Sequence, residues 1–225
     1  MKDGARTERL GAPLAGMRER AAEVVKRLRG KFPRARTALD HGDPFQLLVA
    51  TILSAQCTDK RVNMVTPALF GRFPGPGDFA RADLNEIEAM IKSTGFFHAK
   101  ARSIKGSCTA LVRDFGGRVP GTIEELVKLP GVGRKTANVV LGSAFGIAVG
   151  VVVDTHVKRL TGRLGLTKQA DPERIEEDLV KIVPQVDWIM FSHLLIWHGR
   201  ETCSARKPDC SACVLSDICP SCGKV

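Results

Sequence analysis

Apolar residues recur at intervals of three and four along most of this chain, which is the spacing of helices that bury one face. The run from Phe45 to Leu53 is apolar nearly all round, so this helix is expected to be buried. The short β-branched run from Ala148 to Val153 resembles a strand, but no partner strand is visible and we interpret it as a buried connection. The same spacing predicts nine further helices. Four have both ends given: 63–70, 124–129, 172–183 and 186–198. For the others the pattern gives a start near 17, a start at 134, an end near 115, or only residues inside the helix, which are 87–91 in one and 157 in another.

Polar residues mark where several of these helices begin. Asp43 and Asp171 each precede a proline, which is the arrangement of an N-cap followed by proline at the first helical position. The segments Thr122–Glu125 and Asp83–Glu86 have the spacing of a capping box, in which two residues satisfy backbone donors reciprocally. These signals predict helix starts independently of the apolar pattern.

The stretch Leu129–Ala137 joins two predicted helices through a turn that has almost no side chains, and this pattern predicts a helix-hairpin-helix. Gly131 and Gly133 are expected to adopt backbone angles that a residue with a Cβ would resist. Backbone N–H groups at such a turn and at the following helix N-terminus suit a phosphate, although an ordinary tight turn is the alternative. The basic pair Arg134 and Lys135 beside this turn favours a site for the DNA backbone.

Two charged residues near this hairpin are candidates for catalysis. Lys135 falls in the first turn of the second helix, where the helix dipole disfavours its cation and so favours a neutral, nucleophilic amine; the alternative is a solvated surface lysine. Asp154 is expected to be the N-cap of the helix after 148–153. The buried connection would carry this carboxylate toward Lys135, or the residue only caps its helix. His156 fits a structural role better than a catalytic one.

The net charge indicates the kind of partner. The chain has 225 residues, of which 44% are hydrophobic, enough for one sizeable core or two small lobes. A formal net charge of +10 favours a polyanion bound through sequence-independent electrostatics. Aromatic residues make up 5% and tyrosine is absent, which argues against binding single strands on a row of stacked rings.

The termini and targeting signals add little to this picture. We interpret residues 1–16 as a loose basic tail, either solvated or in contact with DNA. No secretory signal and no apolar run of membrane length is found, so we expect a soluble intracellular protein of the cytoplasm or nucleoid, without a membrane partner.

Four of the seven cysteines fall in one compact loop near the end of the chain, at Cys203, Cys210, Cys213 and Cys219. Disulfides are not expected in a chain without a secretory signal. Zinc remains an alternative, but its sites usually consist of two short knuckles separated by a longer loop, and four thiolates this close fit an iron-sulfur cube better. Cys222 adds a second chelating spacing with Cys219. Cys57 and Cys108 lie in helical patterns and are expected to be buried thiols.

Three further segments contain candidate DNA contacts. The polar segment Ser54–Asp59 follows a buried helix and either presents its side chains into a groove or only caps the next helix. Of Phe96 and Phe97, one exposed ring could wedge between bases, while at least one is expected in the core. Arg206 and Lys207 lie inside the cysteine loop, where they would contact phosphate or remain surface charge.

Four of these features, in this order, resemble endonuclease III, the DNA glycosylase and abasic-site lyase of the helix-hairpin-helix superfamily: Ser54–Asp59, Leu129–Ala137, Val153–His156 and the four-cysteine loop. The resemblance implies an all-α fold of two lobes with DNA bound across the cleft between them. One lobe would comprise 17–38 and 152–225, with a cluster loop over 203–219. The other, 39–151, would have six helices and contain the helix-hairpin-helix over 122–146.

The resemblance also assigns roles to individual residues. It implies that Lys135 is the nucleophile, Asp154 the catalytic aspartate, and Gln56 the side chain that fills the gap left by a flipped nucleotide. It implies one [4Fe-4S] cluster whose ligands are Cys203, Cys210, Cys213 and Cys219, with Cys222 as an extra cysteine. Two departures concern the wedge: Phe96 stands where the family often has leucine, and Phe97–His98 replaces a common Tyr-Asn.

The implied function is base excision repair. The expected substrates are oxidised pyrimidines and abasic sites in double-stranded DNA, the expected reaction is base removal followed by a nick through β-elimination, and the expected state is a monomer. Three alternatives are a non-catalytic helix-hairpin-helix DNA-binding module, an adenine-specific glycosylase and a small electron carrier. Lys135 and the short C-terminus argue against the second, and the basic composition argues against the third.

Overall fold

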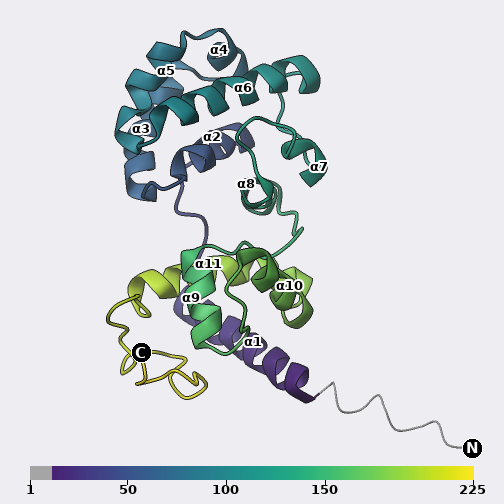
Figure 1. Cartoon of the computed structure of the whole chain (residues 1–225), viewed down its shortest axis with the longest axis vertical. Helices are drawn as coiled ribbons and strands as arrows, with labels where there is room; N and C mark the ends of the chain where they lie inside the picture. Colours follow the sequence, from purple (N-terminus) through teal and green to yellow (C-terminus); the bar gives the residue numbers. More distant parts are fainter. Residues whose placement is uncertain (1–11) are drawn as a thin grey trace, which may run out of the picture. The chain divides into compact units, whose positions relative to one another are not determined.

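The computed structural model describes residues 12–225, and all the regular structure in that range is helical (Figure 1). The all-α prediction is therefore confirmed. The chain divides into two compact units: a terminal unit made of the segment up to Arg36 together with 150–225, and a central unit, Thr37–Val149. The predicted boundaries, after residues 38 and 151, each lie two residues later than these. No helix of the described range is both long and apolar enough to cross a bilayer.

The central unit is built around a helix that is buried on nearly all sides. This helix, α2, has eight buried residues between Phe45 and Leu53, as predicted from its apolar run. It contacts at least four other helical elements of the unit, because an all-apolar helix must be covered all round. The helices of the unit are α2 (Pro44–Ser54), α3 (Asp59–Arg72), α4 (Pro76–Arg81), α5 (Leu84–Ile91), η1 (Lys92–Thr94), α6 (Phe97–Phe115), α7 (Ile123–Leu126), α8 (Arg134–Val140) and the π-helical turn η2 (Leu141–Phe145).

The terminal unit joins the two ends of the described chain around a second apolar core. Its helices are α1 (Ala12–Lys31), α9 (Thr155–Arg163), α10 (Pro172–Ile182), η3 (Gln185–Asp187) and α11 (Trp188–Glu201). Helix α11 packs against α1 and α9, and its residues Phe191, Leu194 and Leu195 are fully buried in this core (Figure 1). The segment leading to α9 has no regular structure, and Val151 and Val153 within it are buried, as predicted.

Most of the predicted helix caps form. The carboxylates of Asp43, Asp154 and Asp171 each accept a backbone N–H of the first turn of their helix. The two predicted capping boxes differ from expectation. The Thr122 hydroxyl accepts the Glu125 N–H, as in a capping box, but it also donates to the Glu125 carboxylate. The carboxylate therefore binds the Thr122 hydroxyl, whereas in a capping box it binds the backbone N–H of the cap residue.

The second predicted box is disrupted by an ion pair. Asp83 accepts a hydrogen bond from the Asn85 N–H. The Glu86 carboxylate, which was expected to reach back to the cap, is instead bound by Arg72, with Arg72 Nε 2.6 Å from Glu86 Oε1.

The predicted loose tail over 1–16 is wrong for its last residues, because α1 already begins at Ala12. Proline is tolerated in the first turn of a helix, so Pro13 does not delay this start. Leu14 and Met17 also pack against the terminal core, which stabilises the extra turn. The rest of that prediction, over 1–11, lies outside the described residues.

The central unit has seven α-helices where six were expected. The additional short helix, α4, begins inside the Pro- and Gly-rich segment that was interpreted as a loop. Pro76 supplies the first helical residue, and the Asp78 carboxylate accepts the Gly75 N–H at 3.1 Å. This local capping, together with the complete burial of Phe79 and the packing of α4 on α6, stabilises the short helix.

The hairpin between α7 and α8 is a tight turn in which the two glycines differ. Gly131 has φ +76°, and a Cβ built on it would lie 2.4 Å from Ser103 Cβ on α6. Gly133 has φ −85° and ψ 174°, an extended conformation open to any residue, and a Cβ there would meet nothing within 4 Å. The expectation that both glycines need special angles is therefore correct for Gly131 and wrong for Gly133, which serves as the N-cap of α8.

This difference predicts the stability of two matched variants. Gly131→Ala should destabilise the protein by about 2–4 kcal/mol, because alanine would combine a left-handed backbone with a Cβ that overlaps Ser103. Gly133→Ala is the control, and only the loss of a favourable N-cap, about 0.5–1 kcal/mol, is expected. Urea denaturation followed by circular dichroism measures both free energies of unfolding, and equal losses would contradict the interpretation.

Candidate active site and metal centre

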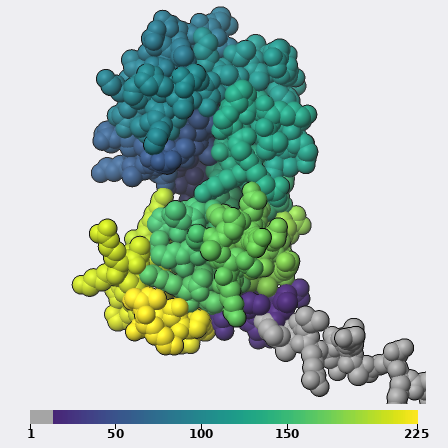
Figure 2. Space-filling model, viewed as in Figure 1, coloured from purple at the N-terminus to yellow at the C-terminus, as the bar shows by residue number. Residues whose placement is uncertain are grey.

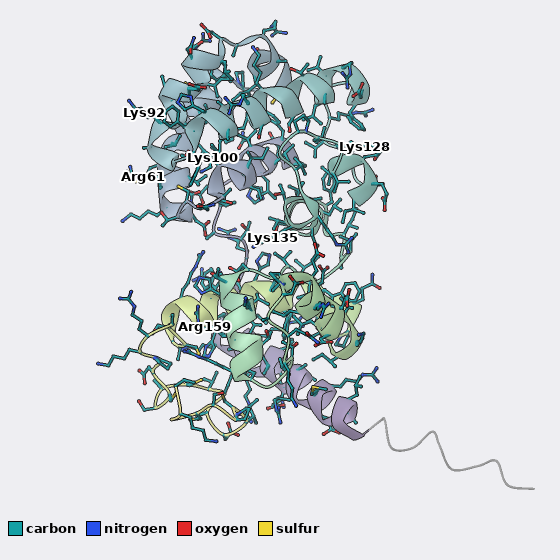
Figure 3. The ribbon with its side chains drawn as sticks, in the orientation of Figure 1. Arg61, Lys92, Lys100, Lys128, Lys135 and Arg159 are labelled. Atoms are coloured by element: carbon teal, nitrogen blue, oxygen red, sulfur yellow. The ribbon has the colours of Figure 1, made fainter. Side chains whose placement is uncertain are left out.

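Lys135 is the second residue of α8 and is exposed (Figure 3). The first N–H that donates within this helix is that of Ala137, which binds the Gly133 carbonyl at 3.0 Å. The backbone N–H groups of the residues before Ala137 have no acceptor inside the helix, as at every helix start. They lie next to Gly133, which has no side chain. Arg134 is also exposed. The sequence correctly predicted that Lys135 lies in the first turn of the helix after the hairpin, and its role as a nucleophile stays a prediction.

Asp154 lies at the start of α9, directly after the buried connection. Its Oδ1 accepts the Val157 N–H at 2.8 Å, so the predicted N-cap forms. The side chain is half-buried. Asp154 belongs to the terminal unit and Lys135 to the central unit, so the two candidate catalytic residues are held by separate bodies. His156 Nδ1 accepts a hydrogen bond from Arg159 at 3.2 Å, in keeping with a structural role.

Gln56 and Phe96 share an uncommon backbone conformation. Gln56 has φ +51° and Phe96 has φ +48°, and within residues 12–225 they are the only non-glycine residues with positive φ. Both are exposed, with the Phe96 side chain 66% exposed, while Phe97 is partly buried against the central core. Cys57 lies outside α2 and α3 and is half-buried, so its predicted place as a buried helical thiol is wrong.

Lys100, which was not identified from the sequence, contacts the segments that lead into Gln56 and Phe96. Lys100 on α6 is only 5% exposed, and its ammonium donates to the carbonyls of Leu53 and Thr94, each at 2.8 Å (Figure 3). Burial lowers its pKa below the usual lysine value, and the nearby Cys57 partly opposes this shift. A lysine within an amphipathic helix gives no signal of such a contact, because both acceptors come from distant parts of the chain.

The four predicted cysteine ligands line one cavity in the terminal unit, of about 430 Å³ including its open mouth. Cys203 follows α11, and the other three lie in the turns after it, where Figure 2 shows the C-terminal segment in yellow on the surface of the unit. Cys222 lines the same cavity. Cys108 is buried elsewhere, and burial raises the pKa of its thiol to about 12, so it is inert.

The four predicted cysteine ligands share a cavity and do not form a ready-made site for one metal ion. In the described range, no three His, Cys, Asp or Glu side chains are close enough to share one metal ion. A tetrahedral zinc ion needs all its ligands at about 2.0–2.3 Å from a single atom, whereas a cluster of four irons is bound at four separate corners. Four cysteines that line one cavity are the donor set that an iron-sulfur cluster needs.

Three basic residues outside the cysteine loop hold it in place and were not identified from the sequence. Arg163 donates to Cys203 Sγ at 3.2 Å and to the Ser204 carbonyl at 2.8 Å. Arg159, one turn earlier on α9, donates to the Cys203 carbonyl at 3.0 Å. Two arginines at i and i+4 on an otherwise amphipathic helix were the one signal in the sequence.

The third of these residues is His198, which lies next to a predicted ligand. Its Nε2 is 3.4 Å from Cys213 Sγ, and burial lowers its pKa to about 4, so it is neutral at physiological pH. In the sequence it is only the last residue of the apolar helix predicted over 186–198, which gives no signal of this contact. Arg206 and Lys207 are both exposed on the cysteine loop.

Comparison with known families gives two matches that together cover most of this chain. The HhH-GPD superfamily of base excision DNA repair proteins matches residues 49–185. The iron-sulfur binding domain of endonuclease III matches residues 203–219, which is the predicted cluster loop.

Individual relatives agree with these families. The chain is 58% identical to endonuclease III of Synechocystis sp. over 208 residues, covering 92% of this chain and 95% of the relative. It is 46% identical to endonuclease III of Bacillus subtilis over 189 residues, covering 84% of this chain and 86% of the relative.

Solved structures give the same result. A non-covalent endonuclease III–DNA complex matches with a TM-score of 0.85 and 42% identity, covering 90% of this chain and 95% of that one. A thermostable thymine-DNA glycosylase matches with a TM-score of 0.81 and 25% identity, covering 92% and 98%. With its hairpin, its exposed lysine and its cluster loop, the chain belongs to the endonuclease III family of iron-sulfur DNA glycosylases within the HhH-GPD superfamily of base excision repair proteins.

Proposed function

We propose that this protein removes oxidised pyrimidine bases from double-stranded DNA and then nicks the strand 3′ to the abasic site. The observation that supports this most directly is the exposed amine of Lys135 in the first turn of α8, beside the bare backbone of the hairpin. A nucleophile at this place would meet a sugar whose flanking phosphate is bound by the same turn.

The reaction follows from amine chemistry. The damaged nucleotide leaves the base stack, and the neutral Lys135 amine attacks its anomeric carbon while the base departs with the electron pair of the glycosidic bond. The amine loses a proton and the sugar ring opens, which leaves a Schiff base. A base then removes a proton from C2′, and the electron pair released there expels the phosphate oxygen from C3′. The strand is cut and the lysine is recovered by hydrolysis.

In this scheme Asp154 stabilises positive charge on the sugar or the lysine and assists proton transfer. The Asp154 carboxylate accepts the Val157 N–H at the N-terminus of α9 through its Oδ1 atom. Its capping and catalytic roles are compatible, since a carboxylate has more than one oxygen lone pair to offer.

We propose that DNA is bound by several parts of the surface. The turn at Gly131 and Gly133, with Arg134, binds a phosphate, while Gln56 and Phe96 fill and wedge the disrupted stack. Arg206 and Lys207 contact phosphate from the cluster loop. Other exposed cations of the central unit stand close in sequence to the two wedge segments, namely Arg61 and Lys92 (Figure 3).

The cluster is structural in this proposal, since base excision needs no electrons from it. Its ligands are Cys203, Cys210, Cys213 and Cys219, and its contribution is to hold a loop that contains no helix. The protein acts as a monomer on chromosomal DNA in the cytoplasm or nucleoid. One chain supplies every residue that the mechanism uses.

Borohydride reduction of the Schiff base tests the nucleophile. Lys135→Ala should lower the yield of trapped complex on a duplex with one thymine glycol by at least about 10³-fold, because the attacking atom is gone. Its affinity for the same duplex should change by about fivefold or less, since one exposed charge is a small part of the interface. Lys128→Ala removes an exposed lysine from the same hairpin and should trap normally. Trapping by the Lys135 variant would leave the non-catalytic DNA-binding module as the better assignment.

Substitutions at Asp154 separate capping from catalysis. Asparagine caps helices as well as aspartate, so Asp154→Asn should unfold within about 0.5 kcal/mol of the wild type, yet lose about 10²-fold or more in single-turnover rate. Asp154→Ala should lose both. Asp171→Ala removes an N-cap in the same unit and should cost about 1 kcal/mol of stability with an unchanged rate. A fully active Asp154→Asn variant would show that Asp154 only caps.

The cluster ligands can be tested without measuring activity. Cys213→Ser should purify with little iron and with a destabilised terminal unit, because the loop loses one of four anchors. Cys222→Ser should keep its full iron content. Iron analysis and thermal denaturation measure these effects. If Cys222→Ser loses its iron while Cys219→Ser keeps it, Cys222 is the fourth ligand in place of Cys219.

A further inference from the structure

The two candidate wedge residues are held in a conformation that their side chains disfavour. Gln56 and Phe96 both have left-handed backbone angles, which are uncommon for glutamine and unfavourable for an aromatic residue. Such strain persists only where the surrounding structure fixes the backbone. Both side chains are exposed, so packing of the side chains themselves does not explain how the conformation is maintained.

The contact that fixes both segments is made by one buried ammonium. Lys100 Nζ donates to the Leu53 carbonyl and to the Thr94 carbonyl, each at 2.8 Å. Leu53 lies three residues before Gln56, and Thr94 lies two residues before Phe96. The main chains that lead into the two wedge residues are therefore joined through a single atom.

The chemistry of lysine suits this position. Its ammonium has three donors and no acceptor, and it reaches its partners on a four-carbon stem that can be buried among apolar groups. The Leu53 carbonyl lies in the last turn of α2, where the helix dipole places partial negative charge. Thr94 is itself buried and its hydroxyl is bound to the Ile91 carbonyl, so the second acceptor is rigid.

We propose that Lys100 is a positioning residue that sets the spacing and direction of Gln56 and Phe96, so that both enter the base stack together when the damaged nucleotide leaves it. This inference rests on the proposed function. A mismatch of about 1 Å between two groups that must act together can cost about 10²-fold in rate. The distance between the two segments is thus a quantity that the enzyme has to fix.

The proposal separates two steps of the reaction. Extrusion of a base from a paired duplex depends on the two wedge residues and therefore on Lys100. Schiff-base formation at an abasic site in a single strand needs no wedge, because there is no stack to open. Loss of Lys100 should slow the first and spare the second, whereas general damage to the fold would slow both.

The test compares Lys100→Met with Lys105→Met. Lys105 lies on the same helix, is partly buried, and donates to the Ala82 carbonyl, which leads into neither wedge segment. Single-turnover excision of thymine glycol from a duplex should fall by about tenfold or more in Lys100→Met and stay within about twofold in the control. Borohydride trapping on a single-stranded abasic oligonucleotide should stay within about twofold of the wild type in both.

A double-mutant cycle provides an independent measurement. In a Gln56→Ala, Phe96→Ala background the wedge is absent, so adding Lys100→Met should slow duplex excision by no more than about twofold further. If Lys100→Met fails to fold, Lys100→Gln replaces it, since the amide keeps two donors without the charge. Circular dichroism and urea denaturation establish which variants are folded.

Two results would overturn the inference. The first is an equal loss on the duplex and on the single strand, and the second is a full additional loss in the background that lacks the wedge. Failure of the wild-type protein itself to trap on an abasic duplex would instead refute the proposed lyase function, and with it the role of Lys100.

Discussion

The hairpin packs tightly against α6, and the candidate active site depends on this contact. Gly131 approaches Ser103 so closely that no side chain fits at this point of the turn. One turn further along α6, Ser107 donates to the Pro130 carbonyl at 2.6 Å, and a Cβ on Gly106 would lie 3.1 Å from Pro130 Cβ. Small residues on one face of α6 thereby fix the turn that starts α8 and so place Lys135.

The same helix also fixes the candidate wedge. Lys100, Ser103 and Ser107 recur at helical spacing, so one face of α6 contacts the wedge segments at one end and the hairpin further along. A helix of 19 residues is stiff over this length, and it can hold the candidate nucleophile and the two candidate wedge residues in a constant relation. Precise placement therefore comes from buried helical contacts, although the functional residues themselves lie in turns and at helix ends.

The C-terminal loop of the terminal unit contains no helix, so contacts with other elements hold it in place. Arg159 and Arg163 of α9 bind the backbone and sulfur at Cys203, and His198 of α11 contacts Cys213. The loop is thus tied to two helices before any cluster is considered. In the proposed function, a cluster held in this way would orient the residues between its ligands, among them the candidate phosphate contacts Arg206 and Lys207.

The sequence alone determined features that depend on neighbours within a few residues. Caps such as Asp43 and Asp154, the hairpin, and the cysteine spacing are local, and their chemistry follows from a few adjacent side chains. Only the tertiary structure decided which glycine of the hairpin is indispensable and that α1 begins at Ala12. It also revealed Lys100, whose acceptor Leu53 lies 47 residues away, because a buried charge is explained by partners that the chain brings together only on folding.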